Sequence, residues 1–202
     1  MGRTIEKSCK SRGLNLAQYY YTIAALPYLS FDVPPPISVE EFLSFCRDTL
    51  TESDWEILRQ VSLFGEETGG NELLARWHQW ERSFRSELAR LRASRLGLDA
   101  ESIPRIVPES GRVGEVARAA LMEGSPAVAE QLILKAYWEV LEELEVNHFF
   151  DLEKLLIYYL KLQILHLQAQ RNREEGVKNF TSVYHRIREQ RENPILERWS
   201  TQ

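Results

Sequence analysis

The chain has 202 residues, of which 44% are hydrophobic and 27% are charged, a balance that argues against extensive disorder. Its net charge of −5 excludes a general attraction to nucleic acid or anionic lipid, so any such affinity has to be local. The two cysteines, Cys9 and Cys46, suggest neither a disulfide framework nor a zinc site.

Residues 1–15 are a polar leader without a signal-type apolar core, and Glu6 stands where a myristoylation motif has Ser or Thr. We therefore expect a cytoplasmic protein. The apolar and aromatic segment 16–29 follows. Its YYYTI run favours a strand locally, whereas its overall length and the proline that ends it favour a short helix. We expect the helix.

Capping residues predict where the next two helices begin. Ser38 with Glu41 forms a capping box for a helix that runs to about Asp48. Thr51 with Asp54 begins another helix in a similar way.

The longest predicted helix runs from about Glu72 to Leu96, with Asn71 as its N-cap and Gly97 as its stop. Its apolar residues recur at steps of three and four, which predicts one continuous buried stripe. The stripe consists of Leu73, Trp77, Trp80, Phe84, Leu88 and Leu91. Segment 99–114 is rich in Pro, Gly and Ser, and it is the predicted hinge between helical parts at 16–98 and 115–191. We expect residues 192–202 to form a tail.

Beyond the hinge we expect a short helix at 113–123 and a helix that begins at Ser125 and Pro126 and ends near Glu145. The predicted buried side of that second helix comprises Leu132, Ala136, Val140 and Leu144. We expect a last helix to begin at 172–175. No segment alternates with period two, so the predicted fold is all-α, a bundle of about seven or eight helices.

The stretch 148–167 is apolar around nearly its whole circumference, although it carries Glu153, Lys154 and Lys161. Its longest uninterrupted apolar run, Leu155–Leu160, is too short to span a membrane. A helix that is apolar on all sides has to be surrounded by other helices. We therefore predict that this stretch, capped by Asp151, is the central axis of the bundle and that the chain does not insert into a membrane.

No pattern of catalytic residues stands out: there is no phosphate loop and no nucleophile elbow. Glu145 and His148 form one Glu-x-x-His step, which di-iron bundle proteins use twice. Because a single copy falls at a helix end, we favour a histidine that interacts with the helix's own carbonyls. For Lys161 we favour a side chain that follows the helix surface to a carboxylate or water over one with a perturbed pKa. We expect no enzymatic activity, no metal and no cofactor.

One charged feature remains as a candidate interface. The long helix is rich in arginine, and we assign an arginine stripe to it that consists of Arg82, Arg85, Arg92 and Arg95. This stripe suits an acidic partner or a phosphate backbone. It equally suits neutralisation within the fold, by Glu81 at i,i+4 from Arg85 or by the acidic residues between 139 and 145. Nucleic acid is the less favoured ligand.

Several stretches together resemble a known family. They are YYYTIAALPYLSFD, ISVEEFLSFCRDTL, FRSELARLRASRLG and AEQLILKAYWEVLEELEVNHFFDLEKLLIYYLKLQILHLQAQRNREEGVKNF. They resemble bacterial proteins encoded beside vacuolar/archaeal-type ATPase subunits, a family remotely similar to the C subunit (d in eukaryotes) of the rotary ATPase.

The resemblance implies a helical fold like that of this central-stalk protein, and a non-catalytic adaptor or assembly factor with the central shaft and the proteolipid ring as partners. In such a complex it would be peripheral at the cytoplasmic face of the inner membrane and contribute to proton or sodium transport without an active site of its own. The alternative is a stand-alone helical module that binds RNA or another acidic partner through the arginine stripe.

Overall fold

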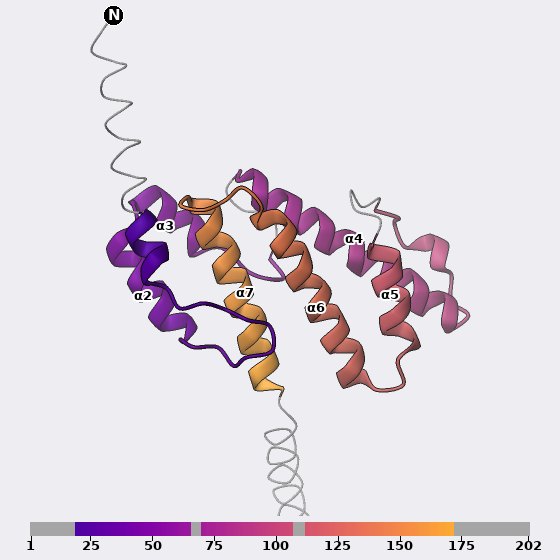
Figure 1. Ribbon diagram of the computed structural model, residues 1–202. Coiled ribbons are helices and arrows are strands. Elements are labelled where there is room, and N and C mark those ends of the chain that lie inside the picture. Colours follow the sequence, from indigo (N-terminus) through magenta and orange to yellow (C-terminus); the bar gives the residue numbers. More distant parts are fainter. Residues whose placement is uncertain (1–18, 66–69, 107–111, 172–202) are drawn as a thin grey trace, which may run out of the picture. The chain divides into compact units, whose positions relative to one another are not determined.

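The computed structural model describes residues 19–65, 70–106 and 112–171 (Figure 1). The described residues form helices and no strand, which confirms the predicted all-α bundle. Residues 19–25 are helical, in agreement with the expectation for segment 16–29. The other elements are α2 (Val39–Thr49), α3 (Glu52–Leu58), α4 (Glu72–Arg95), the 3-10 helix η1 (Ala100–Ser102), α5 (Val113–Met122), α6 (Pro126–Glu145) and α7 (Leu152–Gln170).

The chain divides into two compact units, residues 1–166 and residues 167–202. The first unit contains every element except the end of α7, and the contacts that follow lie within it. In the second unit the structure describes residues 167–171, which continue α7 to Gln170. The predicted last helix and the predicted tail lie outside the described residues. The predicted hinge at 99–114 stays a prediction.

The helix ends are built as the capping pattern predicts. At the start of α2 the Glu41 amide donates to the Ser38 hydroxyl and the Ser38 amide donates to the Glu41 carboxylate, the reciprocal pair of a capping box. The Asn71 side chain accepts from the Leu74 amide at the start of α4. Gly97 follows the end of α4 with a φ of +69°, a left-handed conformation that costs glycine little.

Helix α7 is buried around its circumference. Its buried residues are Leu155, Leu156, Ile157, Tyr159, Leu160, Lys161, Leu162, Ile164 and Leu165. These nine positions cover every direction around the axis, because successive residues of an α-helix are separated by about 100°. This confirms the prediction of a central helix surrounded by other elements. In Figure 1, α7 runs between the α2–α3 pair and α6.

Polar side chains of α7 tie distant loops to the central helix. The Gln163 carboxamide accepts from the Leu63 amide at 2.9 Å and donates to the Val61 carbonyl at 3.3 Å. The Tyr158 hydroxyl donates to the Pro27 carbonyl at 2.9 Å. These bonds satisfy loop backbone groups that burial would otherwise leave without water. They join segments 100 to 131 residues apart in sequence, so they hold the loops against α7.

An aromatic cluster joins α4 to α6. The Tyr137 ring lies edge-on to Trp77, Trp80 and Phe84, with ring centroids 5.4, 5.5 and 5.7 Å away. Edge-to-face packing at these distances adds to the free energy gained from burial alone. The predicted stripe of α4 is therefore core, except that Leu91 at its end is only half-buried.

The predicted buried side of α6 is largely wrong. Of its four residues only Ala136 is buried, while the other three are half-buried. The side that faces the core instead carries Leu134, Tyr137, Trp138 and Leu141. The helix is apolar over a wide arc, and the orientation found buries its two largest aromatic side chains, which have the most surface to remove from water.

Among the described residues, no helix is long and apolar enough to cross a membrane.

Candidate functional site

The four arginines of the arginine stripe are exposed on α4. Three of them make contacts within the fold. The Arg82 Nε donates to the His78 carbonyl at 3.3 Å, and Arg95 donates to the Leu121 carbonyl at 2.9 Å. Arg85 pairs with Glu81 and lies over the Phe64 ring, 5.1 Å from its centroid.

Arg92 differs from the other three, because its side chain makes no ion pair or hydrogen bond with any described residue. The i,i+4 pair between Glu81 and Arg85 is confirmed. The prediction that the acidic residues of α6 neutralise the stripe is not confirmed, because Glu139 and Glu143 instead pair with Arg112. A role for the stripe in binding a phosphate backbone or an acidic partner stays a prediction.

A second charged group lies between α6 and α7. The Glu145 carboxylate accepts hydrogen bonds from both Lys154 and Lys161. Lys161 is only 8% exposed, and its ammonium also lies 5.1 Å from the centroid of the Trp138 ring, a favourable cation–π arrangement. The expectation that Lys161 reaches a carboxylate is confirmed. Burial raises the pKa of Glu145, but the two lysines lower it by more than burial raises it. The net pKa is therefore below its usual value.

Glu81 is the opposite case. Its side chain is almost fully buried, and its carboxylate pairs with Arg85 and accepts from the Tyr137 hydroxyl at 3.3 Å. Burial raises the pKa of Glu81 by more than these partners lower it, so the net pKa lies above its usual value. In the aromatic cluster, the folded state thus holds a proton on this carboxyl at a pH where the unfolded chain has released it.

We expect the free energy of unfolding to fall as pH rises from the ordinary glutamate pKa of 4.5 to the raised pKa of folded Glu81. The folded state binds more protons than the unfolded state in that interval, so deprotonation favours unfolding. Glu81→Gln should remove this fall. Urea unfolding of both proteins from pH 3 to pH 8 measures the difference.

Glu145→Gln is the matched control with the opposite sign. Because the folded pKa of Glu145 is lowered, the stability it contributes is present above the ordinary pKa and is lost as pH falls through the folded value. The destabilisation caused by Glu145→Gln should therefore shrink in acid. If the Glu81→Gln difference shrank in acid in the same way, the assigned direction of the Glu81 pKa would be wrong.

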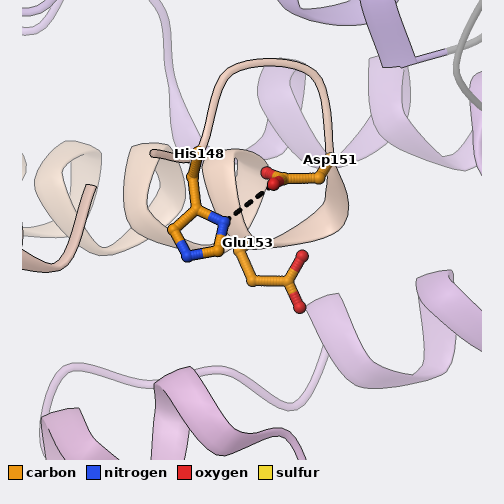
Figure 2. Close-up of side chains that lie close together, drawn as sticks. All are labelled: His148, Asp151 and Glu153. Carbon is orange, nitrogen blue, oxygen red and sulfur yellow. Dashed lines mark hydrogen bonds and ion pairs between the residues drawn. The ribbon is translucent and has the colours of Figure 1, made fainter. Parts of the chain in front are cut away.

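Among the described residues, a group of potential ligand atoms lies in the connection between α6 and α7 and in the first turn of α7. Figure 2 shows His148, Asp151 and Glu153 there, with one possible ligand atom of each within 4.8 Å of the others. The His148 Nδ1 is 2.7 Å from the Asp151 carboxylate. The prediction that the His148 ring contacts helix carbonyls is wrong. The ring instead contacts the Asp151 carboxylate.

The same residues have structural roles. Asp151 accepts from the Lys154 amide at 3.0 Å and so caps α7, as its position predicts. Glu153 accepts from the Asn71 carboxamide at 3.2 Å, and Asn71 caps α4. The N-termini of α4 and α7 therefore meet here, and their positive ends stabilise the carboxylates. The Glu145-x-x-His148 step does not form a site, since Glu145 is bound to lysines.

Residues far away in sequence complete this group. The Tyr19 hydroxyl donates to Asp54 at 2.7 Å. Burial raises the pKa of Tyr19, and so do the Asp54 hydrogen bond and the charges of Asp54, Glu153 and Asp151. Three carboxylates, one from α3 and two from the start of α7, thus act on one hydroxyl. The sequence does not predict this gathering, because its only local signal is the helix-capping position of Asp151.

Comparisons with known proteins give no match to this chain among protein-family models, curated proteins or solved structures.

Proposed function

We propose that this chain is a non-catalytic subunit or assembly factor of a vacuolar/archaeal-type rotary ATPase, a central-stalk adaptor that couples the shaft to the proteolipid ring through protein contacts. The proposal rests on the sequence stretches quoted above for the family resemblance. Within it, the chain is cytoplasmic and peripheral at the inner membrane, and it contributes to ion transport without chemistry of its own.

The structural observation that supports the proposal is the burial of α7 on all sides. An adaptor that transmits torque has to resist deformation, and a helix buried on all sides is constrained by close packing along its length. Hydrogen bonds from Gln163 and Tyr158 further join α7 to the loops at 61–63 and at Pro27. This construction is suited to transferring force from one partner protein to another.

Co-purification tests the proposal. A chain with an affinity tag, recovered from gently solubilised membranes, is expected to bring shaft and ring proteins with it at a reproducible ratio. The proposal fails if quantitative mass spectrometry finds no rotary ATPase subunit enriched over an untagged control.

The arginine stripe is tested in the same experiment. Arg92→Ala is expected to reduce recovery of the partner, because the Arg92 side chain is exposed and makes no ion pair or hydrogen bond with the described residues. Arg118→Ala is the matched control, since Arg118 is exposed on α5, outside the stripe. Equal recovery of the partner with both variants would reject the stripe as the interface. The adaptor proposal itself is tested by the wild-type chain, which does or does not recover ATPase subunits.

A further inference from the structure

Exposed aromatic side chains gather next to the carboxylates described above. We define the aromatic corner as Tyr20, Tyr21, Phe149 and Phe150. The Tyr20 ring contacts both Phe150, with centroids 4.9 Å apart, and Tyr21, with centroids 5.6 Å apart. Tyr21 and Phe149 are 73% and 67% exposed. Exposed rings in contact with one another are typical of protein interaction surfaces.

The charge around the aromatic corner is negative. Phe150 directly precedes Asp151, and Tyr20 directly follows Tyr19, whose hydroxyl is bound to Asp54. Among the described residues, neither Asp54, Asp151 nor Glu153 forms an ion pair with a lysine or an arginine. The nearby Lys154 is already bound to Glu145. The corner therefore combines aromatic faces with carboxylates that no lysine or arginine of the described ranges neutralises.

We propose that the aromatic corner docks a basic segment of a partner protein, whose arginine or lysine side chains lie over its rings and pair with Asp54, Asp151 and Glu153. A guanidinium group stacks on aromatic faces and binds carboxylates in a planar fork, so it satisfies both features at once. The carboxylates repel phosphate groups, which disfavours RNA. This surface is distinct from the arginine stripe, and the inference does not depend on the ATPase proposal.

The competing occupant is a divalent metal ion. It would use His148, Asp151 and Glu153 (Figure 2) and would leave the rings of Tyr21 and Phe149 exposed. A basic peptide with apolar residues covers the rings and the carboxylates together. The extent of the exposed aromatic surface therefore favours the protein segment.

The test uses the full chain and a fluorescent 12-residue peptide in which arginine alternates with leucine, with a glutamate–leucine peptide as the charge-reversed probe. Fluorescence anisotropy at low salt gives the dissociation constant. We expect the arginine peptide to bind and the glutamate peptide not to bind. Removing the three carboxylate charges, by Asp54→Asn, Asp151→Asn and Glu153→Gln together, is expected to weaken binding by about tenfold, or about 1.4 kcal/mol.

These amide substitutions are chosen to preserve the fold. Asparagine caps helices about as well as aspartate, and glutamine can still accept the Asn71 hydrogen bond. The matched control removes the same charge from exposed positions elsewhere, by Glu40→Gln, Glu115→Gln and Glu123→Gln. It is expected to change affinity by less than about twofold, since the screened contribution of distant charges is small.

The rings have their own control. Tyr21→Ala with Phe149→Ala is expected to weaken binding by about five- to thirtyfold, because each of the two exposed cation–π contacts contributes roughly 0.5–1 kcal/mol. Tyr28→Ala removes an exposed ring outside the corner and should have no effect.

Four results would overturn the proposal. They are no binding of the arginine peptide, equal weakening by the control charge set, equal binding of the glutamate peptide, and zinc or manganese binding that depends on His148 and blocks the peptide. Circular dichroism of each variant verifies that it is folded.

Discussion

Trp77→Ala is expected to lower the free energy of unfolding by about 3–5 kcal/mol, the range for removing a fully buried large aromatic side chain. Trp77 is completely buried, and its ring packs on Trp80 and against the edge of Tyr137. Its loss leaves a cavity where α4 meets α6. Because a domain of this size is stable by only about 5–15 kcal/mol, chemical denaturation should show a large shift of the midpoint.

Two further variants make this result interpretable. The Trp77 indole N–H finds no hydrogen-bond partner among the described residues, and a buried donor without a partner is unfavourable. Trp77→Phe removes this donor and keeps most of the ring, so its loss should be clearly smaller. Tyr28→Ala, at a side chain that is 91% exposed, should stay within about 0.5 kcal/mol of the wild type. Equal losses for Trp77→Ala and Tyr28→Ala would contradict the burial of Trp77.

Glu145→Ala is expected to cost about 3 kcal/mol. The substitution leaves the Lys161 ammonium almost fully buried without its carboxylate, and removal of one partner of a buried ion pair is strongly destabilising. The Glu145 side chain is 22% exposed, which places the loss at the low end of the range for buried pairs. Urea denaturation at neutral pH measures it.

The double variant Glu145→Ala with Lys161→Met distinguishes two causes of the loss. One is the missing attraction between the two side chains, and the other is the buried ammonium that is left without a countercharge. If the buried ammonium causes the destabilisation, methionine should restore most of the stability, since apolar replacements of buried pairs are often neutral. Glu143→Ala is the exposed control, because its 3.7 Å contact with Arg112 lies in solvent, where ion pairs contribute less than about 1 kcal/mol. No recovery in the double variant would contradict this account of Lys161.

The features that sequence predicts well are those decided by neighbouring residues. The caps at Ser38 and Asn71 follow from side chains that reach the next turn of backbone, and Gly97 follows from the conformation needed at the end of a helix. The Glu81–Arg85 pair is set by the i,i+4 spacing. The burial of α7 follows from composition, since no face of that helix is polar.

The features that sequence predicts poorly depend on packing between distant elements. The orientation of α6 could not be chosen from its periodicity, because several arcs are apolar and the decision lies with the partners of Tyr137 on α4. The identity of Glu145 as the carboxylate that Lys161 reaches depends on how α6 and α7 pair. The gathering of Asp54, Asp151 and Glu153 around Tyr19 combines three separate segments, so no local pattern indicates it.

Thiol labelling around α7 tests the central claim, that this helix is enclosed on every side. Single cysteines replace Leu156, Ile157, Leu162 or Leu165, which are buried and point in four different directions. The background carries Cys9→Ser and retains Cys46, which is buried and whose pKa burial raises to about 12, so it should not react in the folded protein.

The exposed control is Leu96→Cys. Position 96 should be labelled rapidly, and all four positions of α7 should be labelled only on unfolding in denaturant. Rapid labelling of any one of those four positions in the folded protein would show an open face on α7 and contradict the account.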